Sequence, residues 1–345
     1  MPPAMKSIAT SALLVLAIAG ILPFAAPQKA SAQKQIIYAV LHDEGNLAIV
    51  DPASGKLVQR IQVGRAPDCI MPNADNSKLY ISNTGEITVS IVSVADAKVS
   101  QVLRLPVNRR NIYAGPMTRT PDGATIFVAE RADGDEALRI YAIDTKKELI
   151  TGQFDAGASI SALSVSNDGK KLFVVNKGKG VKIFDAATYQ DLGAVDPLKG
   201  LADNITGMAC SPVAPKAYIS YGPKNHVQVV NTDTYKTTGD VAMPKYKTGA
   251  QGDISFSGDG RYAFIINRKV DLKEIDGINV MDAAKDEIIK IFNSGIVQRG
   301  IVVAPDNNTC YIAADELKWY NLAKLEHQRS INLRTTVHGI AVIVK

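Results

Sequence analysis

The chain has 345 residues, of which 46% are hydrophobic and 21% charged, a composition typical of a folded protein with a large core. Its formal net charge of +5 is too small for a polycation, so we expect no specific affinity for nucleic acid. Aromatic residues make up only 6% of the chain and glycines number 26, which favours turn-rich β-structure over long helices.

The first 32 residues are predicted to be a secretion signal. Lys6 supplies a short basic region, residues 12–26 are apolar, and Ala30-Ser31-Ala32 forms an A-x-A cleavage site before Gln33. The apolar run is shorter than a typical membrane span, although an uncleaved anchor is the alternative. Cleavage would remove Lys6 and Lys29 and lower the net charge from +5 to +3. We therefore expect a periplasmic or secreted protein with no membrane span after cleavage.

Residues 33–345 contain a repeated unit in which an apolar strand ends in Asp, Asn or Ser before a short polar turn. The spacings between these strand ends are 42, 51, 41, 46, 51 and 39 residues. A unit that recurs at this period is typical of a propeller, because one small sheet cannot bury its faces without neighbours. The seven strand ends are Asp51, Ser93, Asp144, Asp185, Asn231, Asp282 and Asn321.

A second position in the repeat is a tight turn followed at once by a strand. The turns are centred on pairs such as Asp122-Gly123, Asp168-Gly169 and Asp259-Gly260, which tolerate the positive φ of hairpins. Short β-branched and aromatic runs follow them, as buried strands require. These runs cover residues 78–83, 125–128, 171–176, 217–220, 262–267 and 310–313.

The two ends of the repeat region complement each other. Residues 339–344 match the innermost strand of a repeat, but no turn and second strand follow them. Residues 35–40 match a second strand with no inner strand before them. We predict an all-β, seven-bladed β-propeller of four-stranded antiparallel blades, closed by the C-terminal strand joining the first blade, because closure removes exposed sheet edges.

The recurring pattern resembles the YVTN-type propeller repeat of bacterial periplasmic and surface proteins, as in residues 166–176, SNDGKKLFVVN. The resemblance covers nearly all of residues 35–345 and concerns turn and core residues, so it implies the fold. Within that group the layout is similar to the β chain of quinohaemoprotein amine dehydrogenase, a periplasmic seven-bladed propeller that docks beside haem and quinone subunits. Other propellers of the group are lactonases or binding proteins.

Cysteine and histidine patterns predict no cofactor or metal site. Cys69, Cys210 and Cys310 are placed in blades that are not neighbours, so we expect three free, buried thiols, and no C-x-x-C-H motif is present for haem. The chain has four histidines, and no two lie at the short spacing of a shared metal site. They are His42, His226, His327 and His338.

The variable loops on one face of the propeller, here called the top face, are where we expect binding, because they combine length with a rigid scaffold. Their charged residues are predominantly basic, which favours an anionic ligand or an acidic protein partner. The predicted ligand-binding residues are Arg109, Arg110, Tyr113, Asp253, Gln298, Arg299 and His338.

Two classes of function remain open from the sequence. The first is a noncatalytic binding or scaffold protein that takes a protein partner or an anionic ligand on the top face. The second is an enzyme component, either the propeller subunit of an amine dehydrogenase or a lactonase-like hydrolase. The first is favoured because no nucleophile with its base, dinucleotide fingerprint or metal cluster is recognisable, so the isolated chain is expected to be noncatalytic.

Overall fold

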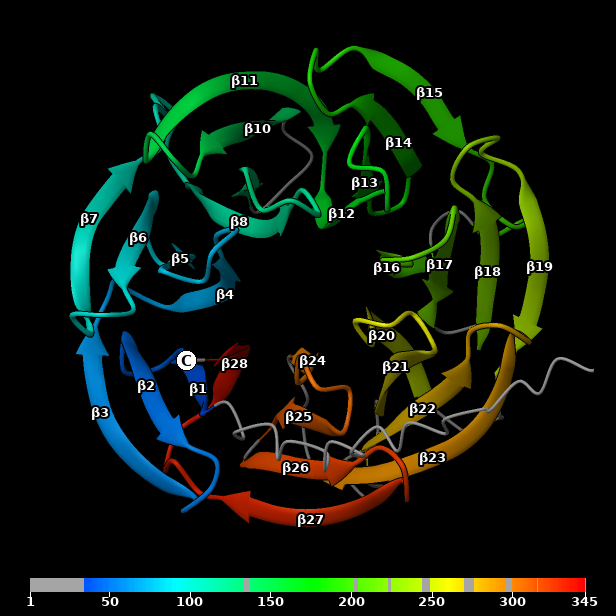
Figure 1. Cartoon of the computed structure of the whole chain (residues 1–345). Coiled ribbons are helices and arrows are strands. Elements are labelled where there is room, and N and C mark those ends of the chain that lie inside the picture. The colour runs from blue at the N-terminus through cyan, green and yellow to red at the C-terminus, as the bar shows by residue number, and fades with distance from the viewer. Residues whose placement is uncertain are drawn as a thin grey trace, which may run out of the picture. The chain divides into compact units, whose positions relative to one another are not determined.

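Seven four-stranded antiparallel sheets surround a central axis, as Figure 1 shows. The computed structural model describes residues 34–132, 137–201, 204–222, 225–243, 249–269, 276–295, 300–314 and 316–344. In this described part each sheet is one blade, and its strands run outward from the axis. The predicted seven-bladed β-propeller is confirmed. The predicted signal peptide lies outside the described residues.

The strand bounds follow the predicted repeat, with the innermost strand given first for each blade. The first blade consists of β28 (Val337–Val344), β1 (Gln35–Leu41), β2 (Asn46–Asp51) and β3 (Lys56–Gln62), and the second of β4 (Pro67–Pro72), β5 (Lys78–Asn83), β6 (Thr88–Ser93) and β7 (Lys98–Arg104). The third blade consists of β8 (Ile112–Arg119), β9 (Thr125–Ala132), β10 (Ala137–Asp144) and β11 (Leu149–Ala158). The fourth consists of β12 (Ile160–Val165), β13 (Lys171–Asn176), β14 (Gly180–Asp185) and β15 (Asp191–Val195). The other three are β16 (Ile205–Cys210), β17 (Lys216–Tyr221), β18 (His226–Asn231) and β19 (Thr237–Ala242); β20 (Gly249–Phe256), β21 (Tyr262–Lys269), β22 (Asp276–Asp282) and β23 (Glu287–Gly295); and β24 (Gly300–Val303), β25 (Thr309–Ala313), β26 (Leu317–Asn321) and β27 (Glu326–Ile331).

The C-terminal strand closes the ring in the first blade. β28 pairs antiparallel with β1, and the register places Tyr38 opposite Ala341 and Ile37 opposite Val342. This pairing joins the two ends of the repeat region in one sheet (Figure 1). The predicted closure is therefore confirmed, and it gives the first blade the inner strand that the N-terminal repeat lacks.

The seven predicted strand ends are the last residues of the third strands, where their side chains form the following turns. Asp144 Oδ1 accepts hydrogen bonds from the backbone N–H groups of Lys146 and Lys147 at 3.0 and 2.8 Å. Asp185 makes the same contacts with Ala187 and Thr188 at 3.0 and 2.7 Å. These residues are turn formers, as the sequence indicates.

The core lies between neighbouring blades. In β6 every residue is buried, whereas in the outer strand β3 only Ile61 is buried. Middle strands are covered on both faces because each blade packs against two others. Tyr38 and Leu47 of the first blade thus share one cluster with Leu79 of the second. The ring is held by apolar burial at the blade interfaces, which scales with the area removed from water.

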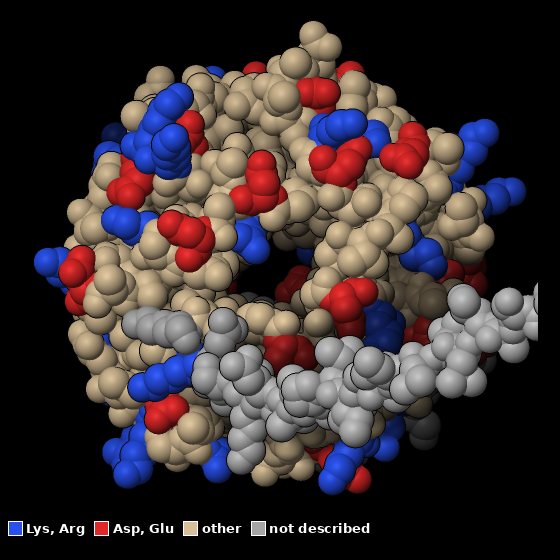
Figure 2. All heavy atoms as spheres, in the orientation of Figure 1, with Lys and Arg blue, Asp and Glu red and all other residues tan. Residues whose placement is uncertain are grey.

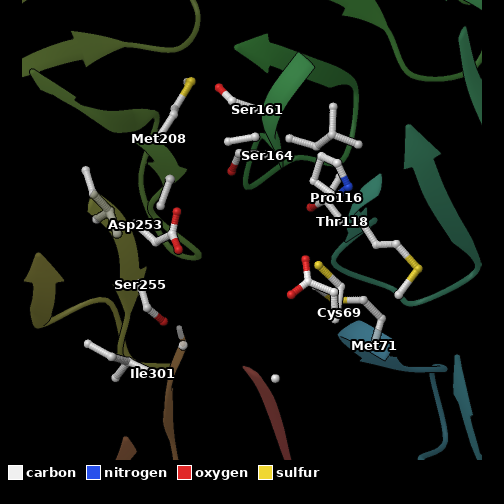
Figure 3. Close-up of a pocket in the computed structure, with 18 of the residues that line it drawn as sticks. Cys69, Met71, Pro116, Thr118, Ser161, Ser164, Met208, Asp253, Ser255 and Ile301 are labelled. Atoms are coloured by element: carbon white, nitrogen blue, oxygen red, sulfur yellow. The ribbon is translucent and has the colours of Figure 1, made fainter. Parts of the chain in front are cut away.

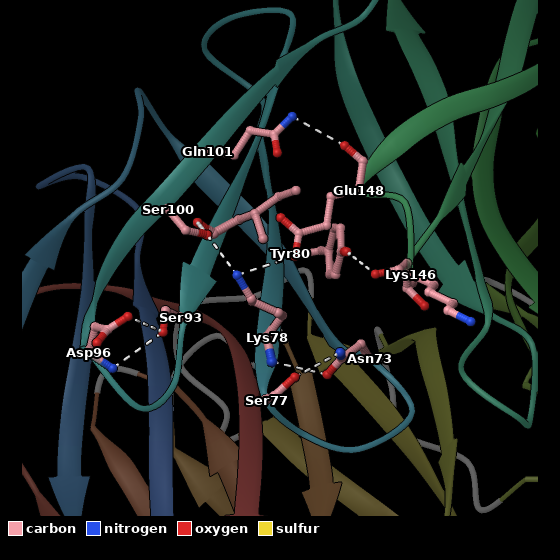
Figure 4. Close-up of polar contacts among 12 residues, drawn as sticks. Asn73, Ser77, Lys78, Tyr80, Ser93, Asp96, Ser100, Gln101, Lys146 and Glu148 are labelled. Carbon is pink, nitrogen blue, oxygen red and sulfur yellow. Dashed lines mark hydrogen bonds and ion pairs between the residues drawn. The ribbon is translucent and has the colours of Figure 1, made fainter.

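Polar contacts also cross from one blade to the next (Figure 4). Lys78 Nζ, at the start of β5, lies 3.2 Å from Glu148 Oε1 in the turn between β10 and β11. Tyr80 donates its hydroxyl to the carbonyl oxygen of Thr145 at 3.1 Å, and Gln101 donates to the carbonyl of Glu148 at 3.1 Å. The second and outermost strands of one blade are therefore tied to the outer turn of the next.

Acidic and basic side chains are intermixed around a central opening on the part of the face that Figure 2 leaves uncovered. Residues 34–345 group as one compact unit. Among the described residues, no helix has the length and apolar character needed to cross a membrane.

Candidate functional site

A pocket of about 710 Å³ lies on the propeller axis and is lined by the inner strands (Figure 3). Hydroxyl side chains reach it from several blades, including Thr118, Ser161 and Ser255. Four residues near the start of an inner strand also line this space. They are Asp68, Ser161, Thr206 and His338. The volume is in the range of about 300–1,000 Å³ found for small-molecule sites.

The charged residues of the pocket carry both signs. Asp253 on β20 directs its carboxylate into the pocket in Figure 3. Arg131 on β9 and Lys177 after β13 are exposed and also line it. Asp68 and His338 complete the set. A ligand in this space would therefore meet two carboxylates, a guanidinium, an ammonium group and an imidazole.

Sulfur atoms of Cys69, Met71 and Met208 line the same pocket (Figure 3). Burial and the neighbouring Asp68 carboxylate raise the pKa of the Cys69 thiol to about 12. Cys69 is thus a protonated thiol at neutral pH, and a protonated thiol is not a nucleophile. All three cysteines are free, as predicted, and Cys69, Cys210 and Cys310 lie in β4, β16 and β25. Only Cys310 is fully buried, whereas Cys69 and Cys210 are partly buried.

Two histidines and an aspartate meet at the axial mouth between the first two blades. His338 on β28 lies with its Nδ1 2.6 Å from Oδ1 of Asp68 on β4. The ring of His42, in the loop after β1, stacks on His338 with centroids 3.8 Å apart and planes 14° from parallel. His42, Asp68 and His338 each offer one potential ligand atom, and these three atoms lie within 4.8 Å of one another.

The hydrogen-bond partners determine the tautomer of each neutral ring. His42 Nδ1 lies 3.0 Å from the carbonyl oxygen of Pro67. A carbonyl only accepts, so Nδ1 of His42 carries the proton and Nε2 keeps a lone pair. The Asp68 carboxylate also only accepts, so Nδ1 of His338 carries the proton and its Nε2 keeps a lone pair. Burial and the neighbouring charge of His338 lower the pKa of His42.

Asp68 is ionised in this cluster. Burial favours its neutral form, but the hydrogen bond from His338 and the charges of His338, His42 and Arg131 outweigh burial and lower the pKa of Asp68. Asp68 therefore acts as a carboxylate toward His338. The charge of Arg131 also connects the cluster electrostatically to the rest of the pocket.

The structure brings two of the predicted ligand-binding residues together and separates three others from them. Asp253 and His338 line the axial pocket, whereas Arg109, Arg110 and Tyr113 are not among its lining residues. Arg109 instead lies 2.5 Å from the buried carboxylate of Glu130 and donates to the carbonyl of Ala137. Arg110 is exposed. Gln298 and Arg299 lie outside the described residues.

The sequence argued against a shared metal site because no two histidines lie at a short spacing, and this reason was wrong. It required histidines at short spacing, but His42 and His338 come from opposite ends of the chain and stack because β28 closes the ring beside β1. Strand pairing brings together residues that spacing alone separates. The predicted closure contained the useful signal, since it places the start of β28, which includes His338, beside the end of β1 and the loop that follows it.

The chain is similar in sequence to a Salmonella typhimurium protein described as uncharacterized protein YncE. The two are 20% identical over 280 residues, which is 79% of this chain and 76% of the relative. A Salmonella typhi protein with the same description matches with the same identity and coverage. No family model matches the chain.

Solved structures share the fold. A functionally unknown protein from Desulfotomaculum acetoxidans superposes with a TM-score of 0.74 at 12% identity, over 90% of this chain and 99% of that one. Kuenenia stuttgartiensis hydrazine synthase has a TM-score of 0.61 at 15% identity, over 81% of this chain and 86% of that one. At these identities the likeness concerns the fold, and function must be argued from the site.

Proposed function

We propose that the protein is a noncatalytic binding protein that takes a small polar ligand into its axial pocket. The observation that carries the proposal is the pocket of about 710 Å³ on the propeller axis, lined by charged residues of both signs. Its size suits a small molecule better than a protein surface. The proposal thus keeps the small-ligand part of the sequence-based expectation.

The lining charges indicate the chemistry of the ligand. Arg131 and Lys177 are cations to which an anionic group of the ligand would bind. The Asp253 carboxylate faces the same space. It can accept a hydrogen bond from a cationic group or from a neutral donor of the ligand. We therefore expect a ligand that carries both an anionic and a cationic group, such as a free amino acid, and this extends the anionic ligand expected from the sequence.

The proposal includes export and membership of the YVTN-type repeat group. Export is supported by the leader, in which Ala30-Ser31-Ala32 follows an apolar run. Repeat membership is supported by turn-and-strand units such as residues 166–176. Mass spectrometry of a periplasmic fraction tests export: the chain should begin at Gln33, and a chain that keeps Lys6 in the membrane pellet would contradict it.

A calorimetric screen tests the ligand. Purified protein is titrated with amino acids, dicarboxylates and diamines, and the amino acids should bind best because they carry both charges. Asp253→Asn and Arg131→Ala should each weaken binding by about tenfold or more, as expected for a charged hydrogen bond.

Arg110→Ala is the matched control, because Arg110 is an exposed arginine that is not among the lining residues. Binding should be unchanged in this variant. Equal loss in Arg110→Ala and Arg131→Ala would place the ligand on the loops and not in the pocket. If no member of the panel binds, the proposal is overturned.

A further inference from the structure

We propose that His42, Asp68 and His338 form a binding site for one divalent transition-metal ion at the axial mouth. The three side chains come from the loop after β1, from β4 and from β28, and their potential ligand atoms lie within 4.8 Å of one another. Metal–donor bonds of about 2.0–2.2 Å put the donors of one ion about 3–4 Å apart. Because the two rings are stacked with planes 14° from parallel, both side chains would rotate on metal binding to turn their Nε2 atoms toward a common ion.

The surroundings prepare both imidazoles as ligands. The Pro67 carbonyl accepts from Nδ1 of His42 at 3.0 Å, and Asp68 Oδ1 accepts from Nδ1 of His338 at 2.6 Å. In metal sites the second ring nitrogen of a ligating histidine usually donates to a carbonyl or a carboxylate, which orients the ring. Here Nε2 of each ring is the atom left to bind an ion.

Asp68 takes part by orienting His338. Its Oδ1 accepts from Nδ1 of His338, on the ring edge away from Nε2, so the carboxylate holds the ligand and does not itself bind the ion. Two imidazoles leave coordination positions for water or another ligand. Because Asp68 and His338 also line the axial pocket, an ion at the mouth would adjoin that space.

The ligand set selects the class of ion. Imidazole suits Zn²⁺ and Cu²⁺, whereas Mg²⁺ and Ca²⁺ prefer oxygen donors. We therefore assign the site to a borderline divalent ion, with Zn²⁺ and Cu²⁺ as the probes. The metal site goes beyond the proposed binding function and does not depend on it, since it requires only these three residues and their hydrogen bonds.

The experiment uses untagged protein stripped of metal by a chelator. Calorimetric titration with Zn²⁺ should give one ion per chain. His42→Ala and His338→Ala should each weaken binding by about a hundredfold or more, and Asp68→Asn by about tenfold, the effect typical of a residue that orients a ligand. The melting temperature without metal shows whether each variant is folded.

The wild-type protein provides a second readout that does not depend on folding of the variants. Electron paramagnetic resonance of the Cu²⁺ complex should show hyperfine coupling to nitrogen from two imidazoles. His226→Ala is the matched control, because His226 also forms a pair with an aspartate, with Nδ1 2.8 Å from Asp240 Oδ1, and lies in another blade. Metal binding should be unchanged in it.

Three results would overturn the metal site. The first is the absence of stoichiometric Zn²⁺ binding, and the second is a Cu²⁺ spectrum with fewer than two imidazole nitrogens. The third is an equal loss of metal affinity in His226→Ala and His42→Ala, which would mean an adventitious ion only. Metal binding with no amino-acid binding would support this site and contradict the proposed function, so the two failures are distinguishable.

Discussion

His338 and Asp68 are 270 positions apart in sequence, and the Nδ1 of one lies 2.6 Å from the Oδ1 of the other. The contact joins inner strands of two neighbouring blades, β28 and β4. Gly339 permits it: a Cβ at this position would lie 2.7 Å from the carbonyl oxygen of Asp68 and 3.1 Å from Cγ2 of Ile70. The two strands can approach this closely because residue 339 has no side chain.

Gly339→Ala should therefore destabilise the protein by about 1–3 kcal/mol, the usual range for overpacking. Thermal unfolding measures the loss. Gly258→Ala is the control, because a Cβ there would meet Asn307 Oδ1 at 3.5 Å, an ordinary contact. The control should melt at or above the wild-type temperature. If both variants melt alike, close approach of β28 to β4 is not what requires glycine.

Closure of the ring makes β28 essential to the core. Val342 is 8% exposed and belongs to the cluster between the seventh and first blades. Val342→Asp should cost about 3–5 kcal/mol, because it buries an unpaired charge. Removal of residues 338–345 should cause aggregation or loss of a cooperative melt, since a sheet edge is exposed.

Val58→Asp is the matched control for closure, because Val58 is on the outer strand β3 and is 64% exposed. Its stability should be close to that of the wild type. Chemical denaturation compares the variants. A soluble truncated protein with an unchanged melting temperature would show that β28 does not close the ring in solution.

Turn aspartates should make the protein sensitive to acid. Hydrogen bonds from the hydroxyl and backbone N–H of Ser77 lower the pKa of Asp75 below its usual 3.8, and those from Thr120 and Ala124 do the same for Asp122. Because the folded-state pKa is lowered, the stability these groups contribute is present above their unfolded pKa. It is lost as the pH falls through the folded value, from about pH 4 downward.

The double variant Asp75→Asn, Asp122→Asn should therefore lose less stability than the wild type between neutral and acid pH. Denaturant unfolding at a series of pH values measures this slope. Glu326→Gln, an exposed change on the outer strand β27, is the control and should keep the wild-type slope. An unchanged slope in the double variant would show that the turns do not carry the acid response.

The cysteines should be slow to react in the native protein. Burial, which is the main cause, raises the pKa of Cys69 and Cys210 to about 12 and also raises the pKa of Cys310. The thiolate is the reactive form, so a disulfide reagent at about pH 8 should modify the native protein much more slowly than the unfolded protein. Unfolded protein should show three thiols. Fewer than three would reveal a disulfide.

The repeat architecture could be predicted from the sequence because its determinants are local. Turn residues such as Asp168-Gly169 need only neighbouring backbone groups, and the φ of Gly169 is +75°, a conformation that glycine adopts readily. The strand after this turn was predicted at residues 171–176, and β13 is Lys171–Asn176. Closure was also predictable, since a missing strand at one end matched a surplus strand at the other.

The candidate site was only partly predictable. The axial position of Asp253 and His338 follows from the strand order, which the repeat determines. The engagement of Arg109 with Glu130 could not be predicted, because ion pairing depends on side-chain positions across a hairpin. The basic character predicted for the top loops likewise does not reveal which cations line the axial pocket. The structure shows that Arg131 and Lys177 line it.

The sequence by itself determined the blades, their order and the closing strand, because hydrophobic alternation and turn chemistry act between residues close in the chain. Only the tertiary structure decided that His42 stacks on His338 and that Asp68 holds the second ring. The physical reason is that a closed ring brings inner strands from distant repeats to one axis, where contacts between side chains depend on backbone approach and rotamer and not on spacing along the chain.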